Sequence, residues 1–291
     1  MNQISFFDGN KKFVFDKPIR LIELFAGVGS QAMALRDLGI PLEHWRVCEF
    51  DKYAITSYNA IHGTDFEPSD ICQLHAEDLG IADTDKYLYI MTYSFPCQDL
   101  SKAGKGKGMA RGGNTRSGLL WEVERLLDEC GELPQLLLME NVPDVVGTSN
   151  VKHFAEWVQK LESMGYYNKW EILNAKDYGI PQNRERCFMV SLQGDYYYDF
   201  PKPVPLELRL KDMLEDDVPE SYYISDAQVE KIINSTFSVT ANSIYDGGGI
   251  RDIMCQRLQG SEVCKTVRTS GRGSLDRHSW DMVIENGEVD I

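Results

Sequence analysis

The chain has 291 residues, of which 43% are hydrophobic and 26% charged, which fits a globular protein of one large domain, or a large and a small one, and excludes wholesale disorder. Its formal net charge of -15 argues against a generic polyanion-binding protein, since those are basic. No apolar run approaches the roughly 20 residues of a membrane span, and the start carries no signal-peptide pattern, so we expect a cytoplasmic protein without a membrane partner. Seven cysteines without CxxC spacing favour neither a disulfide framework nor a metal site.

The first 190 residues alternate short apolar runs with helical patterns, which predicts an α/β fold with a doubly wound, mostly parallel sheet. The expected strands cover residues 20–24, 46–50, 87–92, 135–139 and 187–190, and the expected helices 31–38, 52–61, 119–130 and 151–161. Ser117 and Asn150 are candidate N-caps of the last two helices. Because a Pro-rich linker follows near residue 200, we expect one domain over residues 1–191 and a smaller, irregular region over 192–291.

Charge is segregated along the chain. Residues 99–116 hold five basic and one acidic residue, and residues 251–277 hold six basic and three acidic ones. Residues 207–220, in contrast, hold six acidic and two basic residues. Because local charge decides what a site attracts, one face could still bind a polyanion despite the net charge.

A glycine turn follows the first expected strand. It reads Phe25-Ala26-Gly27-Val28-Gly29-Ser30-Gln31-Ala32, and an acid, Glu49, ends the next strand 22 residues after Gly27. Glycines let a ligand approach the backbone, and a carboxylate at this spacing can bind ribose hydroxyls, which suggests an adenosine-containing cofactor. The alternative is a plain turn with an exposed acid, and the pattern alone does not separate NAD from S-adenosylmethionine.

Three further segments carry candidate chemistry. Phe95-Pro96-Cys97-Gln98 follows a strand at the edge where doubly wound sheets bind ligands. The next residues are glycine-rich and basic, and they form either a lid that contacts phosphate or an ordinary loop. Glu140, in Met139-Glu140-Asn141-Val142, ends an apolar strand, where desolvation would raise its pKa and let it donate a proton. Gln182, Arg184 and Arg186 would share one face of a strand, and arginines suit phosphate or a pyrimidine carbonyl, unless they form a surface salt bridge with Glu185.

In their order and spacing these segments resemble the DNA cytosine-5 methyltransferase family. The matching stretches are Leu24 to Gly29, Glu49 to Asp51, Asp70-Ile71, Phe95 to Gln98, Arg116 to Leu120, Glu140 to Val142 and Gln182 to Arg186. They cover roughly residues 20 to 191, and the Pro-Cys-Gln, Glu-Asn-Val and Gln-x-Arg-x-Arg trio is highly specific.

The resemblance implies transfer of a methyl group from S-adenosylmethionine to C5 of a cytosine in duplex DNA. It implies that Cys97 adds to C6, that Glu140 binds N3 and the exocyclic amine, and that Arg186 with Arg184 positions the base carbonyl and Cys97, while Asn141 holds the Glu140 loop. The residues implied to bind the cofactor are Phe25, Ala26, Gly27, Gly29, Glu49, Phe50, Asp70, Ile71, Pro96 and Leu119.

The same resemblance implies a double-stranded DNA partner whose target base is flipped out of the helix. The loop over residues 101–116 would close on that base, and residues 192–291 would form the target-recognition region. The candidate DNA-binding residues are Lys102, Lys105, Lys107, Arg111, Arg268 and Arg272, with phosphate contact favoured over base contact. The family resemblance also implies a place in a restriction-modification system. It implies no metal cofactor.

One departure from the family pattern leaves the activity of the chain open. Two C-terminal blocks of the family are not found, and Arg257-Leu258-Gln259-Gly260 matches part of one in the wrong context. We therefore expect either a truncated chain or one half of a two-polypeptide enzyme. In the second case the chain would be a cofactor- or DNA-binding subunit of a split methyltransferase, inactive without a second polypeptide that carries these blocks. The glycine turn by itself would also fit a nicotinamide-dependent oxidoreductase, and the catalytic motifs by themselves would also fit an enzyme that acts on RNA.

Overall fold

The computed structural model describes residues 11–100, 108–112, 115–213 and 219, and the backbone of short strands at 264–265, 283–285 and 288–290. The chain divides into two compact units. The first unit comprises Met1–Leu173 and Arg186–Pro201, and the second comprises Asn174–Glu185 and Lys202–Ile291.

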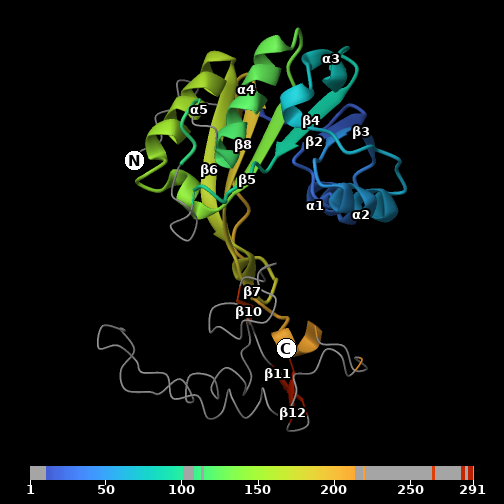
Figure 1. The fold of residues 1–291 in the computed structure, drawn as a ribbon, viewed down its shortest axis with the longest axis vertical. Coiled ribbons are helices and arrows are strands. Elements are labelled where there is room, and N and C mark those ends of the chain that lie inside the picture. The colour runs from blue at the N-terminus through green and yellow to red at the C-terminus, as the bar shows by residue number, and fades with distance from the viewer. Residues whose placement is uncertain are drawn as a thin grey trace. The chain divides into compact units, whose positions relative to one another are not determined.

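A six-stranded sheet forms the centre of the first unit (Figure 1). Its strand order is β3 (Leu42–Cys48), β2 (Ile19–Leu24), β4 (Leu88–Tyr93), β5 (Leu136–Asn141), β8 (Glu185–Gln193) and β6 (Tyr166–Asn174). The first four strands pair in parallel, and β8 pairs antiparallel with β5. The mostly parallel α/β sheet predicted from the sequence is thereby confirmed.

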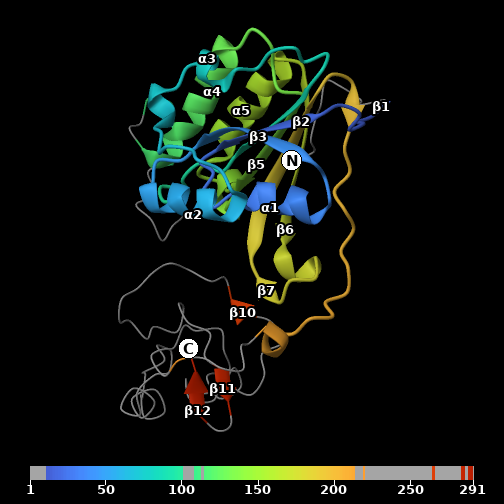
Figure 2. The ribbon, with the colours of Figure 1, turned by 90° about the vertical axis from the view of Figure 1, so that its right-hand side faces the viewer.

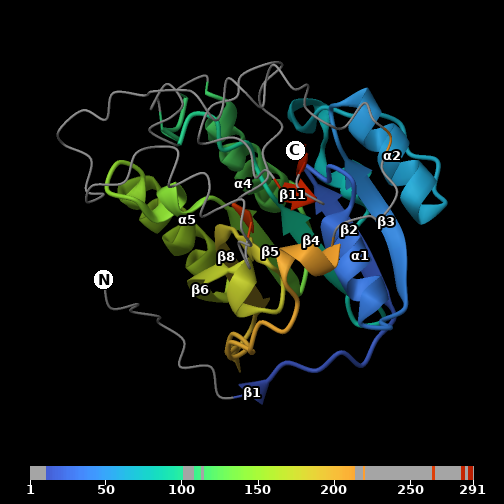
Figure 3. The same cartoon turned by 90° about the horizontal axis from the view of Figure 1, so that it is seen from below.

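Helices cover both faces of this sheet. Figure 3 shows α4 (Leu120–Glu129) and α5 (Val151–Ser163) on one face and α1 (Ser30–Asp37) on the other. The remaining helices of the first unit are α2 (Lys52–His62), α3 (Ala76–Leu79), and the 3-10 helices η1 (Ile71–Gln73), η2 (Arg116–Leu119) and η3 (Pro143–Val146). Because β2 is buried on both faces, its alternate residues enter two different cores: Ile22 packs with the α4 side and Leu21 with the α1 side.

The apolar stripe of α4 explains its place in the fold. Its buried residues Leu120, Val123, Leu126 and Leu127 recur at helical spacing and join the larger core. The helix start differs from the expectation, because Thr115 caps η2 by accepting a hydrogen bond from the Gly118 N–H at 3.0 Å. Ser117, the candidate cap, instead donates its hydroxyl proton to another loop, as described below.

Asn150 occupies the N-cap position of α5 without a side-chain capping bond. Its amide nitrogen donates to the Asp144 carbonyl at 2.9 Å, so the capping role predicted for its side chain is wrong. The Asn150 side chain turns to η3 because only four residues separate this short helix from α5, which places the Asp144 carbonyl within reach of the Asn150 amide.

Strand β6 is absent from the expected elements because its sequence, YYNKWEILN, mixes polar and aromatic residues without a clear period. Strand β8 is longer than expected, since pairing with β5 extends it from Glu185 to Gln193. The boundary predicted at residues 191 and 192 therefore falls inside β8. Two short strands, β1 (Lys11–Lys12) and β9 (Tyr196–Tyr197), pair in parallel.

The described part of the second unit contains η4 (Ala175–Asp177), η5 (Leu210–Met213) and short strands. Strand β7 (Gln182–Asn183) pairs in parallel with β10 (Cys264–Lys265), which lie side by side in Figure 2. Strands β11 (Val283–Glu285) and β12 (Glu288–Asp290) form an antiparallel pair.

Candidate active site

The predicted motifs meet at one edge of the sheet. Leu24 is in register with Cys48 and with Tyr93, and Tyr93 is in register with Met139. Because these four strands run in parallel, the segments that follow them emerge at the same edge. The glycine turn, Glu49, Cys97 and Glu140 therefore all follow strands at this one edge of the sheet.

The glycine turn requires left-handed backbone at three positions. Phe25, Gly27 and Gly29 have φ values of 58°, 57° and 79°. Glycine adopts this conformation freely, but a phenylalanine there stores strain, which is typical of binding loops. A Cβ added at Gly27 would meet nothing within 4 Å, so the backbone of the turn is open to a ligand at this point.

Glu49 closes the turn from the end of β3. Its Oε2 accepts a hydrogen bond from the Gly27 N–H at 2.8 Å, and its Oε1 accepts one from the Asp51 N–H at 2.8 Å. A carboxylate offers about four lone-pair sites, so it has acceptors left for two hydroxyl groups. An open glycine backbone beside a partly used carboxylate fits the ribose of an adenosyl cofactor.

Three more of the expected cofactor residues, Phe50, Asp70 and Ile71, lie near Glu49. Its carbonyl accepts from the Ser69 N–H at 2.8 Å, which brings Asp70 and the buried Ile71 to the end of β3. Asp70 itself caps η1 by accepting from the Cys72 N–H at 3.0 Å. Phe50 is 77% exposed, so its apolar ring is accessible to solvent next to the carboxyl end of β3.

The cysteine loop, residues 95–100, is held by two buried side chains. The Asn141 amide donates to the Phe95 carbonyl at 2.9 Å, and the Ser117 hydroxyl donates to the Pro96 carbonyl at 2.7 Å. Asn141 is 3% exposed and Ser117 is fully buried. The residue next to Glu140 thus fixes the backbone two residues before Cys97, which couples the positions of Glu140 and Cys97.

Three other cysteines of the described chain are held in the thiol form by burial. Burial raises the pKa of Cys48 and of Cys130 to about 11, and burial together with Glu140 raises that of Cys187 to about 12. These three thiols stay protonated and unreactive at neutral pH. Cys97 is half-buried and follows the carboxyl end of β4.

Glu140 forms an ion pair with Arg186. The Arg186 Nε donates to the Glu140 Oε1 at 2.8 Å, and the two side chains are 18% and 23% exposed. The expectation of purely apolar surroundings for Glu140 is therefore wrong, because β8 places a guanidinium against it. Sequence reasoning missed this pair, since the antiparallel register of β5 and β8 is not visible in the sequence.

Arg184 does not share a strand with Arg186. Strand β7 ends at Asn183 and β8 begins at Glu185, so Arg184 lies between them in the second unit. Its N–H donates to the Asn174 Oδ1 at 3.0 Å. The prediction of one strand face for Gln182, Arg184 and Arg186 is wrong, because alternation requires an unbroken strand.

Arg111 is the candidate DNA-binding residue that the structure describes. Its Nη1 donates to Glu124 at 2.8 Å in a bidentate pair, and its guanidinium stacks over Trp121 at 3.8 Å from the ring centre. Its charge thus already has a partner on α4. The other candidates, Lys102, Lys105, Lys107, Arg268 and Arg272, lie outside the described residues.

Within the described ranges, no cluster of three or more His, Cys, Asp or Glu side chains could hold a metal ion. None of the helices in that part of the chain combines the length and apolar character that a bilayer crossing requires.

Comparison with known proteins identifies the family. Residues 19–288 match the model of the C-5 cytosine-specific DNA methylases. The chain is 33% identical to the type II methyltransferase M2.ScrFI of Lactococcus lactis subsp. cremoris over 94% of its own length and 90% of that protein. It is 43% identical to the orphan methyltransferase M.SssI of Spiroplasma monobiae over 61% of its own length, and the match spans 45% of that protein.

Among solved structures, the Dnmt2 methyltransferase of S. pombe has the same fold, with a TM-score of 0.66 and 20% identity over 92% of this chain and 76% of that one. The comparisons give no support to an oxidoreductase or to a split enzyme. The chain belongs to the C-5 cytosine-specific DNA methylase family and is a DNA cytosine-5-methyltransferase that uses S-adenosylmethionine as methyl donor.

Proposed function

We propose that Cys97 and Glu140 are the catalytic residues with which this chain methylates a cytosine flipped out of duplex DNA. The observation that carries the assignment is the Asn141 hydrogen bond, which ties the cysteine loop to the strand that ends in Glu140. A nucleophile and a group that can bind a pyrimidine edge are thereby held together beside the glycine turn.

The cofactor pocket is proposed to comprise the glycine turn and the strand ends around it. Glu49 would bind the ribose hydroxyls with its remaining lone pairs, and Phe25, Phe50, Asp70 and Ile71 would meet the adenine side. Ala26, Gly27 and Gly29 offer backbone, and Pro96 and Leu119 would line the methionine end. When bound, S-adenosylmethionine supplies an electrophilic methyl group at this edge of the sheet.

The residues of the chain would activate the base in three ways. The Cys97 thiolate adds to C6 and forms a C–S bond, which makes C5 electron-rich enough to take the methyl group. Glu140 binds N3 and the exocyclic amine and limits the charge that builds up on the ring. Arg186 holds Glu140 in place through the 2.8 Å ion pair. Loss of the C5 proton to solvent or a base then expels Cys97 and restores the double bond.

DNA binding is proposed to use the basic segments of the chain. Flipping a base costs a few kcal/mol, which phosphate contacts offset. The proposed contacts are Lys102, Lys105, Lys107, Arg111, Arg268 and Arg272. Arg184 is proposed to act with Arg186 in positioning the base carbonyl. Since Arg111 is paired with Glu124, its contribution would require that it exchange or share this partner.

The wider setting is proposed from the relatives. Residues 1–191 would carry the chemistry and residues 192–291 the recognition of the target sequence. The type II enzyme named above supports a role in a restriction-modification system in the cytoplasm, where bacterial DNA lies. A second polypeptide is not needed for this proposal.

The test is transfer of a labelled methyl group from S-adenosylmethionine to unmethylated duplex DNA. We expect the 291-residue chain to form 5-methylcytosine, Cys97→Ser to lose at least about a thousandfold in rate, and Cys72→Ser, which changes an exposed cysteine outside the loop, to keep the rate. Equal labelling by wild type and Cys97→Ser would overturn the catalytic assignment. No labelling by wild type would favour a subunit that is inactive alone.

A further inference from the structure

The rear of the glycine turn packs directly on α2. A Cβ added at Gly29 would lie 2.4 Å from the His62 Nε2 and 2.6 Å from the Tyr58 ring, distances that real Cβ atoms do not show. Tyr58 and His62 are one helical turn apart, and their ring centres are 4.4 Å apart. The rings of Tyr58 and His62 on α2 therefore pack directly against the turn at Gly29.

His62 is hydrogen-bonded to the turn itself. Its Nε2 lies 3.1 Å from the carbonyl oxygen of Val28, between the two glycines. Because a carbonyl only accepts, the imidazole carries its proton on Nε2. The next N–H, that of Gly29, donates to the Ala26 carbonyl at 2.9 Å. Both polar groups of the Val28–Gly29 peptide are thus fixed, one of them by a side chain.

A buried network supports His62 from behind. The Tyr58 hydroxyl donates to the Glu23 Oε2 at 2.6 Å and lies 2.7 Å from the His44 Nδ1. Since the hydroxyl has one proton, the His44 Nδ1 must donate to it. The ring centres of His44 and His62 are 4.9 Å apart. Burial lowers the pKa of His44, and the nearby His62 lowers it further, so both disfavour a positive charge on His44.

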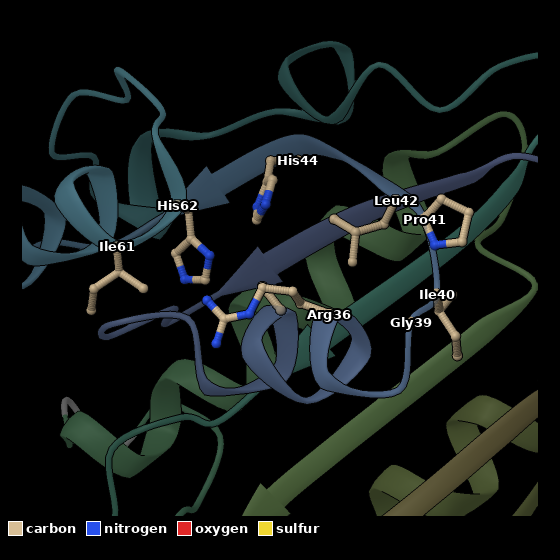
Figure 4. Close-up of a pocket in the computed structure, with 9 residues that line it drawn as sticks. Arg36, Gly39, Ile40, Pro41, Leu42, His44, Ile61 and His62 are labelled. Atoms are coloured by element: carbon tan, nitrogen blue, oxygen red, sulfur yellow. The ribbon is translucent and has the colours of Figure 1, made fainter.

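A cavity of about 360 Å³ lies beside the two histidines, between α1, β3 and α2 (Figure 4). Its lining includes Ile40, Leu42 and Ile61, while Arg36 projects toward His62 and is paired with Asp37. Because this space is not filled by side chains, packing alone does not hold the His62 ring. Its orientation depends on the bond to Val28 and on the neighbouring rings.

We propose that His62 is a positioning residue for the cofactor, which fixes the Val28 carbonyl and so holds residues 27–29 in the shape that receives S-adenosylmethionine. This inference rests on the proposed function, because it assumes that the turn binds that cofactor. His62 does not touch the reacting atoms. Its loss should therefore weaken cofactor binding and leave the chemical step unchanged once cofactor is saturating.

The experiment compares three variants of the full chain. His62→Leu removes the donor, His62→Gln offers an amide N–H of similar reach, and His153→Leu changes a histidine of α5 that pairs with Glu156. Calorimetry with S-adenosylmethionine gives Kd, and steady-state methylation gives KM and kcat. We expect Kd and KM for the cofactor to rise about tenfold in His62→Leu, which corresponds to about 1.4 kcal/mol, with kcat within about twofold. His62→Gln and His153→Leu should bind like wild type.

Amide hydrogen exchange over residues 26–31 gives a readout that does not need the cofactor. Exchange should be faster in His62→Leu and close to wild type in His62→Gln. Unchanged Kd and exchange in His62→Leu would overturn the inference, and so would equal losses in the Leu and Gln variants. If His62→Leu does not fold, His62→Asn, whose amide is too short to reach Val28, takes its place with the same expected result. Failure of the wild type to bind S-adenosylmethionine would overturn the proposed function, whereas the exchange results would still decide the role of His62.

Discussion

The glycine turn and the cysteine loop follow neighbouring parallel strands, β2 and β4, yet they are held in different ways. The turn combines positive φ at Gly27 and Gly29 with two side chains that bind its peptide groups, Glu49 at the Gly27 N–H and His62 at the Val28 carbonyl. The cysteine loop is held by distant side chains, Asn141 and Ser117, which bind two successive carbonyls. Glycines with positive φ thus leave the backbone of the turn open to a cofactor, whereas two buried side chains fix the backbone around the proposed nucleophile.

The largest effect is expected from the anchor of the cysteine loop. Asn141→Leu keeps a similar volume but leaves the Phe95 carbonyl and the Val142 N–H without the partners that Asn141 gives them. Two buried polar groups without bonds cost about 2–5 kcal/mol in the free energy of unfolding. Misplacing the loop should also lower kcat by about a hundredfold. Denaturant unfolding and labelled methyl transfer measure the two quantities.

A matched control for Asn141 is Asn168, another buried asparagine, which lies on β6. Asn168→Leu should lower stability and leave kcat unchanged at temperatures where the variant is folded. If the two variants lost the same fraction of kcat, the loss would reflect stability alone, and the anchoring role of Asn141 would be refuted.

Substitutions at the two glycines of the turn should have different effects, because Gly29 packs against α2 and Gly27 faces the proposed ligand. Gly29→Ala adds the cost of positive φ, about 1–2 kcal/mol, to a clash with His62 at 2.4 Å. Gly27→Ala carries only the φ cost, because its Cβ meets nothing within 4 Å. Unfolding should show a larger stability loss at Gly29, and calorimetry a loss of cofactor affinity in Gly27→Ala that exceeds what its stability explains. Equal stability losses would contradict the packing role of Gly29.

A smaller effect is expected at Ser117. Ser117→Ala removes the hydroxyl that donates to the Pro96 carbonyl at 2.7 Å. A single neutral hydrogen bond contributes about 1 kcal/mol, and a loss of that size in positioning lowers kcat by about fivefold to tenfold. Thr115→Ala, which changes the η2 cap instead, should cost similar stability with a smaller change in kcat. The reverse order of the two kcat values would argue against Ser117 as an anchor of the loop.

The smallest effect concerns pH and the buried network behind the turn. Burial raises the pKa of Glu23 above its ordinary value of 4.5, although the bond from Tyr58 opposes the shift. The folded state therefore holds this proton more tightly than the unfolded state, so the stabilising contribution is complete below pH 4.5 and is lost as pH rises through the folded pKa. Glu23→Gln removes this dependence. The stability of the variant relative to wild type should rise between pH 4 and pH 7 in denaturant unfolding, and a pH-independent difference would disprove the assignment.

The sequence was informative where a residue type is required at a fixed distance from a strand end. The glycines, Glu49, Cys97 and Glu140 meet these conditions, and the structure brings them to one edge of the sheet. The alternation of apolar strands and helices predicted parallel strands, because parallel strands need crossover connections, and parallel strands end at the same edge of a sheet.

The supporting contacts were not predictable, because they join residues far apart in the sequence. Asn141 binds a carbonyl 46 residues earlier, and Arg186 reaches Glu140 only through the antiparallel register of β8. Ser117 shows the same limit: its place before a helix indicates a cap, and only the fold brings the Pro96 carbonyl within its reach.

The central claim is that the Cys97 sulfur bonds to C6 of a flipped cytosine. Duplex DNA that carries 5-fluorocytosine tests it most directly, because fluorine at C5 cannot leave as a proton and the adduct cannot resolve. Incubation with the chain and S-adenosylmethionine, followed by denaturing electrophoresis and peptide mass spectrometry, should give a covalent complex whose modified peptide contains Cys97. A complex attached through another residue, or methylation of normal DNA without any trapped complex on the fluorinated duplex, would contradict it.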